Sequence, residues 1–127
     1  MVKSVLEVSK VSVKALVIGV SNYYIAGASD LPFCKNDVAT MAKSLENGLR
    51  ILESNIITCG NRGDVTKSDF DNALSRMASV TNEEDILIFY FSGHGHNIDQ
   101  QHHLVLSDFF ISTKRVNKEF RENPIKK

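Results

Sequence analysis

The chain has 127 residues, of which 43% are hydrophobic and 24% are charged. This length and composition are typical of one globular domain with a real core. Fifteen basic residues balance fifteen acidic ones, so the net charge predicts no attraction to nucleic acid or to an anionic membrane surface.

Short apolar runs and few cysteines narrow the class of protein further. The longest apolar runs are far too short to cross a bilayer, and no signal peptide is recognisable at the N-terminus. Cys34 and Cys59 have no CxxC spacing, which argues against a disulfide scaffold and against a structural zinc site. We therefore expect a reduced, cytoplasmic protein that does not enter a membrane.

The first half of the chain predicts a strand, a helix and a second strand. Residues 11–20 alternate and then close into a continuous apolar run, as in a strand covered on both faces. A loop rich in Ser, Asn and Gly follows, with Pro32 placed to open a helix that ends near Gly48. One apolar stripe marks this helix: Val38, Met41, Ala42, Leu45 and Leu49. Residues 54–59 predict the second strand.

The second half continues the alternation. Thr66 and Asp69 resemble a helix N-cap pair, although Glu or Gln is the usual partner. The apolar face of the helix that follows is Phe70, Ala73, Leu74 and Met77. Residues 85–91 predict the most apolar strand, which we expect at the centre of the sheet. Residues 102–108 predict a fourth strand, and residues 113–123 a third helix before Pro124.

Strands that alternate with helices imply right-handed βαβ units. The sequence therefore predicts a single α/β domain over residues 1–127, with three layers and a mostly parallel sheet. No internal repeat or low-complexity linker divides it.

The third predicted strand ends in Ser92-Gly93-His94-Gly95. Ligands of open α/β sheets gather beyond the carboxyl ends of the strands. Glycines on both sides remove bulk and permit unusual backbone angles, so His94 can be presented into a cleft, and the Gly95 N–H is a candidate oxyanion donor. Histidine is also the side chain best suited to move a proton near neutral pH. A glycine-rich turn with an incidental histidine fits the same spacing, and from spacing alone both interpretations stay open.

Three motifs together resemble the first half of the caspase-like cysteine peptidases, most closely the metacaspases and their bacterial relatives. They are the first strand with its Asn-Tyr loop, "LPFCKNDVATM" at the first helix, and "FYFSGHG" at the end of the third strand. The resemblance runs from about residue 14 to residue 108. It implies a caspase-like fold and a peptidase that cleaves protein or peptide substrates through a Cys–His dyad.

The resemblance also implies roles for individual residues. His94 is the histidine of the dyad, and the Gly95 N–H contributes to the oxyanion hole. Cys34, Asp37 and Ser92 match positions that line the primary specificity pocket, where Asp37 favours a substrate Arg or Lys over Asp. Without the resemblance, Cys34 reads as a small buried hydrophobe, Asp37 as a helix-capping residue and Ser92 as a local backbone partner. Many metacaspases are activated by calcium, although no calcium ligands can be assigned in this chain.

The chain differs from the family pattern at the nucleophile that the family requires. In the family it follows a later strand, whereas no cysteine occurs after Cys59 in these 127 residues. We therefore expect the chain to be the N-terminal, His-bearing portion of the domain and to be inactive alone. It would be a fragment, a processed subunit that pairs with a cysteine-bearing C-terminal half, or a degenerate relative that binds partners without cutting them. An exposed sheet edge would make it marginally stable, or oligomeric as in a homodimer.

Two other classes of hydrolase remain as alternatives. His94, His96 and Asp99 loosely resemble a metal-ligand run, but the aspartate is displaced, and His102 and His103 point to opposite faces of a strand. A serine hydrolase lacks its Gly-x-Ser-x-Gly elbow. A non-catalytic caspase-like interaction module is the stronger rival.

Overall fold

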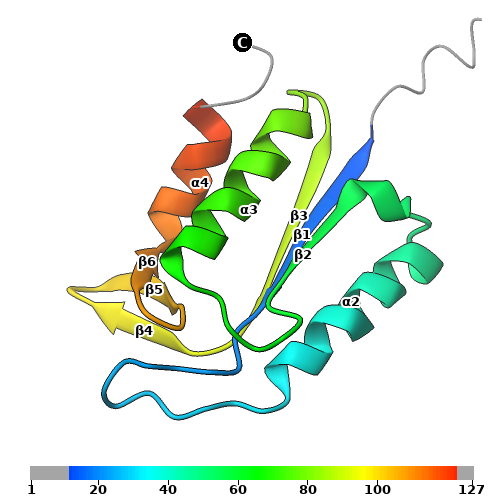
Figure 1. Cartoon of the computed structure of the whole chain (residues 1–127). Helices are drawn as coiled ribbons and strands as arrows, with labels where there is room; N and C mark the ends of the chain where they lie inside the picture. Colours follow the sequence, from blue (N-terminus) through cyan, green and yellow to red (C-terminus); the bar gives the residue numbers. More distant parts are fainter. Residues whose placement is uncertain (1–11, 123–127) are drawn as a thin grey trace, which may run out of the picture.

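Three parallel strands form the middle layer of the domain in the computed structural model, which describes residues 12–122 (Figure 1). β1 (Val13–Gly19) lies between β2 (Ile56–Cys59) and β3 (Ile86–Ser92). The prediction that the third strand is central was wrong, because β3 is an edge strand of the described sheet, where Ile86 is exposed and the other residues are half-buried. The apolar content of a strand indicates that both of its faces are covered. It does not indicate whether other strands pair with both of its edges.

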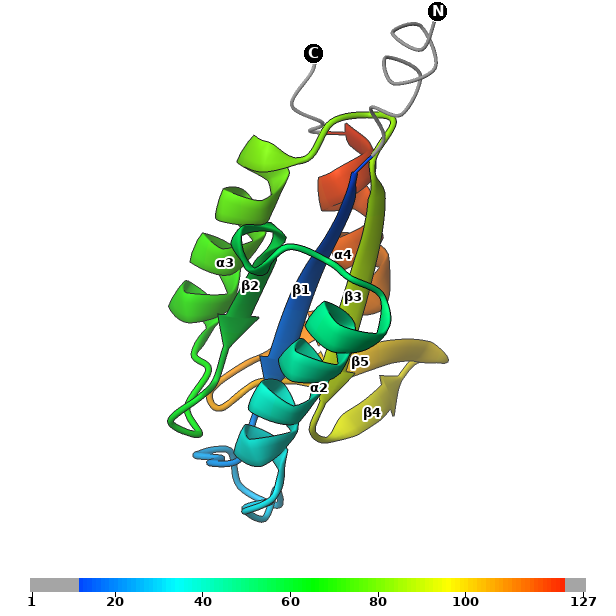
Figure 2. The same ribbon diagram turned by 90° about the vertical axis from the view of Figure 1, so that its right-hand side faces the viewer.

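Helices cover both faces of this sheet, as predicted for three layers. α2 (Cys34–Gly48) packs on one face, while α3 (Lys67–Val80) and α4 (Thr113–Glu122) lie on the other (Figures 1 and 2). Side chains of a strand alternate between faces. Ala15 and Val17 therefore enter the core under α2, and Leu16 and Ile18 enter the core under α3 and α4; all four are fully buried.

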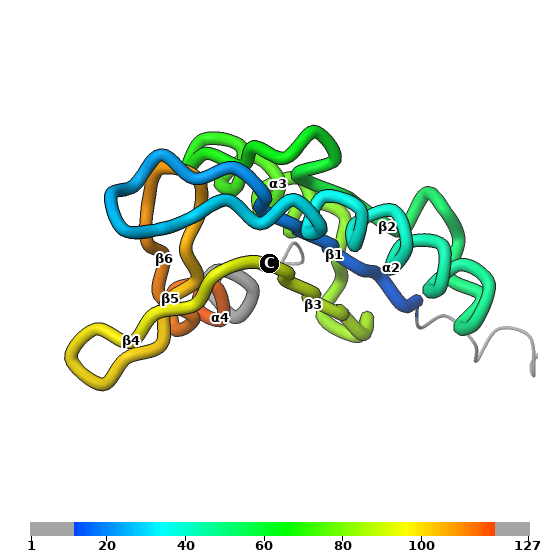
Figure 3. The backbone as a smooth tube through the Cα atoms, turned by 90° about the horizontal axis from the view of Figure 1, so that it is seen from below, coloured from blue at the N-terminus to red at the C-terminus, as the bar shows by residue number. Residues whose placement is uncertain are grey.

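A second sheet projects from the carboxyl end of the first (Figure 3). It contains β4 (Gly95–Ile98), β5 (Gln101–Val105) and β6 (Phe110–Ser112), which pair in antiparallel fashion. The predicted fourth strand therefore exists, but it belongs to this separate sheet and not to the parallel one. The turn between β4 and β5 has only two residues, which permits an antiparallel hairpin and excludes a parallel crossover.

The helix signals were largely confirmed. Thr66 and Asp69 form a complete capping box at the start of α3, with Asp69 in the place of the usual Glu or Gln. The four predicted apolar residues of α3 are all buried. In α2, Val38 and Leu45 are buried, whereas Leu49 lies beyond the helix and is 61% exposed. No helix within residues 12–122 is long and apolar enough to span a membrane.

The opposite end of the sheet is held by a buried ion pair. Lys14 of β1 donates to the carboxylate of Asp85, which precedes β3, and both side chains are at least nine-tenths buried. The same carboxylate accepts the backbone N–H groups of Ser12 and Asn82. Burial acts to raise the pKa of Asp85, but these hydrogen bonds outweigh it and the pKa is lowered. Asp85 thus fixes the start of β3 against β1.

Candidate functional site

His94 lies where the chain passes from the parallel sheet into the second sheet. β3 ends at Ser92, and β4 begins at Gly95, so His94 stands at the carboxyl edge of the parallel strands. Its backbone N–H donates to the hydroxyl of Tyr23 at 2.9 Å, and its carbonyl accepts the N–H of Val105 at 3.0 Å. The position of His94 is therefore fixed from the loop after β1 and from β5.

The imidazole is oriented by a second contact. Its Nε2 lies 2.8 Å from the carbonyl oxygen of Ser29. A carbonyl can only accept, so the hydrogen bond requires the proton on Nε2 and leaves Nδ1 with its lone pair. The ring also lies 4.7 Å from the ring of Tyr23, between centroids, at an interplanar angle of 58°. His94 is thus held in the tautomer in which Nδ1 can accept a proton.

Gly93 makes room for this arrangement. A Cβ at Gly93 would lie 2.6 Å from the hydroxyl oxygen of Tyr23, closer than non-bonded atoms approach. Neither Gly93 nor Gly95 has a positive φ. The expectation that the glycines around His94 supply unusual backbone angles was therefore wrong. Gly93 is required instead because a side chain there would collide with the Tyr23 hydroxyl.

Two of the predicted pocket residues meet next to His94. The hydroxyl of Ser92 donates to the carboxylate of Asp37 at 2.6 Å, which joins the end of β3 to the first turn of α2. Ser92 lies on the face of the sheet that α2 covers, and both side chains are partly buried. The structure therefore places the Asp37 carboxylate at the carboxyl end of β3, against a residue two positions before His94 in the chain.

The two thiols lie in different environments. Cys34 is the first residue of α2 and is buried, with 7% of its surface exposed. Cys59 ends β2, which is separated from β3 by β1. Burial and the nearby Asp69 raise the pKa of Cys59 to about 11, although Arg76 opposes them. Cys34 is thus covered from solvent, and the raised pKa of Cys59 keeps its thiol protonated at neutral pH.

The remaining histidines belong to β4 and β5, and His96 lines one pocket together with His94. The His96 ring lies 5.7 Å from the ring of Phe110, between centroids, and Nδ1 of His103 is 3.0 Å from the carbonyl of Gln101. Asp99 is at the tip of the β4–β5 hairpin. Within residues 12–122, no three His, Cys, Asp or Glu side chains are grouped to hold a metal ion. The metal-hydrolase alternative has no ligand set in that range.

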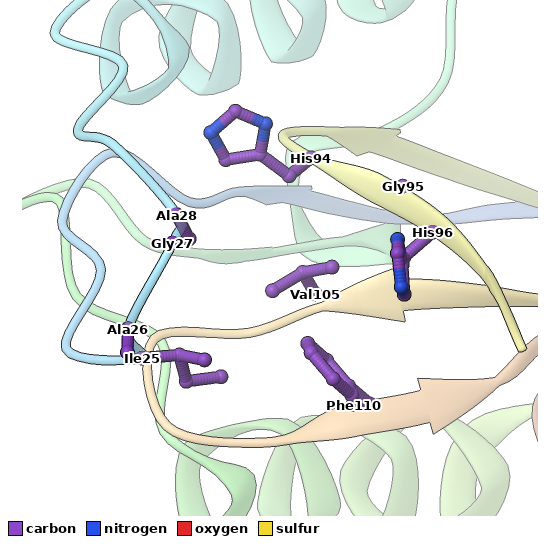
Figure 4. A pocket seen from close by; sticks show the side chains of 9 residues that line it. All are labelled: Ile25, Ala26, Gly27, Ala28, His94, Gly95, His96, Val105 and Phe110. Atoms are coloured by element: carbon purple, nitrogen blue, oxygen red, sulfur yellow. The ribbon is translucent and has the colours of Figure 1, made fainter.

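A pocket of about 280 Å³ opens on the hairpin side of His94 (Figure 4). The loop of residues 25–28 forms one wall, and Val105 and Phe110 lie opposite. Residues 94–96 complete the rim. Within the described part of the chain, no Asp, Glu, Lys or Arg lines this pocket.

Sequence reasoning missed the groups that orient His94. Ser29 acts through its backbone carbonyl, which carries no side-chain signature, and Val105 acts through its N–H. Tyr23 belongs to the Asn-Tyr loop that carried part of the resemblance, so the sequence marked its segment but not its role. The pairing of Ser92 with Asp37 depends on two residues 55 positions apart.

The sequence matches one known protein family over most of its length. A family model described as "Caspase domain" matches residues 12–125. No match was found among curated proteins. The matched range includes the loop after β1, α2, β3 and His94, so the site described above lies inside it. The chain belongs to the caspase-domain family of peptidases.

Proposed function

We propose that this domain supplies the histidine, the substrate-recognition carboxylate and an oxyanion donor of a cysteine endopeptidase. The observation that carries the proposal is the hydrogen bond between His94 and the Ser29 carbonyl, which leaves Nδ1 as a base. An imidazole oriented by a fixed acceptor is the arrangement that serves thiol and hydroxyl nucleophiles in acyl transfer.

The reaction would run in two acyl-transfer steps. A thiol gives its proton to Nδ1 of His94, and its sulfur attacks the carbonyl carbon of the scissile peptide bond. The Gly95 N–H stabilises the oxygen that becomes negative, and the imidazolium returns its proton to the leaving amine as the C–N bond breaks. Water then hydrolyses the acyl-thioester with the same histidine as base.

We assign the thiol to a polypeptide segment beside β3, outside the 127 residues or on a second chain. This fits the half-buried edge strand, on which Ile86 is 55% exposed. It also fits the two thiols present, since Cys34 is buried and the pKa of Cys59 is raised to about 11. A complementary chain or a second copy would cover the same edge.

Asp37 supports a preference for Arg or Lys before the scissile bond. Its carboxylate already accepts from Ser92, and a cationic side chain would add the opposite charge that the partly buried site lacks. Asp-terminated substrates would meet repulsion there.

Cleavage of internally quenched peptides tests the proposal. The 127-residue chain and the product of its complete reading frame are assayed with Arg, Lys or Asp before the scissile bond. We expect cleavage after Arg or Lys by the longer product only, reduced about 10²–10⁴-fold by His94→Ala. His103→Ala, in β5 of the hairpin that follows His94, is the matched control and should retain activity. Activity of the short chain that is lost in Cys34→Ala would overturn the assignment of the thiol.

A non-catalytic binding module is the second candidate. The observation in its favour is that the described site contains no exposed thiol beside His94. In that case the longer product would also fail to cleave any peptide, and His94→Ala would leave partner capture unchanged.

A further inference from the structure

The pocket on the hairpin side of His94 combines apolar side chains with the imidazoles of His94 and His96 on its rim. Ile25 and Ala28 come from the loop after β1, and Val105 and Phe110 come from β5 and β6. Val105 is buried and forms part of the main core, while Ile25 and Phe110 are only partly covered. An apolar surface left partly open next to a candidate base favours an apolar side chain as its occupant.

The pocket and the Ser92–Asp37 pair lie on opposite sides of His94. Ser92 faces α2, and Asp37 belongs to α2. Val105 and Phe110 instead pack with the core under α3 and α4. A peptide that crosses His94 with its recognised cationic residue toward Asp37 therefore directs its next residue toward the pocket. Successive side chains of an extended peptide point to opposite sides, which matches this division.

We propose that the pocket binds an aliphatic residue, such as leucine, on the leaving-group side of the scissile bond. This inference rests on the proposed function, because it assigns a second specificity element to the same site. The volume of about 280 Å³ accommodates a branched aliphatic side chain, and among residues 12–122 no Lys or Arg lines the pocket to offset the burial of an Asp or Glu there.

The loop composition supports the same assignment. Residues 26–28 are Ala-Gly-Ala, and Gly27 has a φ of +90°, a conformation that favours glycine. Small side chains along this wall keep the pocket open. Ala26 is exposed on the wall, so a larger residue there would fill the pocket without entering the core.

A product peptide tests the pocket without catalysis. Cleavage releases a peptide whose new N-terminal residue leaves from beside His94, so Leu-Gly-Gly amide is titrated into ¹⁵N-labelled protein. We expect saturable shifts of the amide signals of Gly95, Val105 and Phe110, and binding at least about tenfold weaker for Asp-Gly-Gly amide. The absence of saturable shifts, or equal binding of both peptides, would overturn the inference.

Two variants in which an alanine is replaced by tryptophan test the location of the binding site. Ala26→Trp should abolish binding of the leucyl peptide, whereas Ala39→Trp, at an exposed position of α2, should leave it intact. Retained binding in Ala26→Trp contradicts the location, and dispersed amide spectra confirm that both variants fold. In the cleavage assay, no hydrolysis of any peptide contradicts the proposed function, whereas hydrolysis with no preference for Leu over Gly after the scissile bond contradicts only this inference.

Discussion

The hydroxyl of Tyr23 accepts the backbone N–H of His94 at 2.9 Å, and the two rings lie 4.7 Å apart between centroids. Tyr23 is buried, and its burial raises the pKa of the phenol even though the hydrogen bond with His94 acts to lower it. The hydroxyl is therefore neutral over the physiological range of pH. One side chain thus fixes both the backbone and the ring of the candidate base.

Tyr23→Phe should loosen His94 without emptying the core. The ring remains, but the His94 N–H loses its acceptor, so we expect unfolding to cost about 1–2 kcal/mol less and the His94 amide to exchange faster. Urea unfolding and hydrogen exchange measure the two effects. Tyr24→Phe is the matched control, because Tyr24 is 65% exposed and its hydroxyl bonds Asp64 at the surface. Unchanged exchange at His94 in the Tyr23 variant would contradict the orienting role.

The Lys14–Asp85 pair makes stability depend on pH in the acid range. Because the folded-state pKa of Asp85 lies below its ordinary value, its contribution is complete above the unfolded-state pKa of about 4 and is lost as pH falls through the folded pKa. At pH 7, Asp85→Asn should cost about 3–5 kcal/mol, since it leaves a buried lysine unpaired. Denaturant unfolding from pH 7 to pH 3 measures both effects.

A surface pair provides the comparison for Asp85. Asp71 is 34% exposed and pairs with Lys67 at 2.7 Å, so Asp71→Asn should cost less than about 1 kcal/mol at pH 7. If Asp85→Asn follows the same pH profile as the wild type, the buried pair does not govern acid stability.

The β4–β5 hairpin carries two strained residues at its tip. Ile98 pairs with Gln101, so Asp99 and Gln100 form a two-residue loop, with φ of 50° and 66°. Such loops favour glycine, and Gln100→Gly should stabilise the protein by about 1 kcal/mol. Gln101→Gly, one position along in β5, should instead destabilise by about 0.5–1 kcal/mol. Thermal unfolding of the two variants gives opposite shifts if the loop conformation is as described.

Cys59 should resist alkylation. With its pKa raised to about 11 from an ordinary value of 9.0, its thiolate at pH 8 is about 100-fold scarcer than that of an unperturbed thiol. Iodoacetamide labelling followed by mass spectrometry, in a Cys34→Ala background, measures the rate. Arg76→Gln should slow labelling further, because Arg76 lowers this pKa. Labelling as fast as that of free glutathione would contradict the raised pKa of Cys59.

Local sequence patterns predicted the helices and strands of this fold well, but they predicted poorly which strands lie next to one another. The apolar run of β1 and the apolar face of α3 identify buried segments, since burial depends on the residues of the segment itself. Strand order depends instead on which distant segments pair, so β3 was placed at the centre although β1 occupies it. The separate antiparallel sheet was missed for the same reason.

The candidate site shows the same division. His94 was predicted because a histidine between glycines at a strand end is visible in the sequence. The Ser29 carbonyl that sets its tautomer has no such signature, because every residue carries a carbonyl. Only the path of the loop after β1 brings that group to the imidazole.

The chain direction of β3 determines how a further strand could pair with its open edge. β1, β2 and β3 run the same way, and β3 reaches His94 at its carboxyl end. A segment added alongside in the same sense would bring its last residues level with Ser92, whereas one added in the opposite sense would bring its first. The polarity of the sheet therefore decides which terminus of an added strand can meet the imidazole, independently of that strand's sequence.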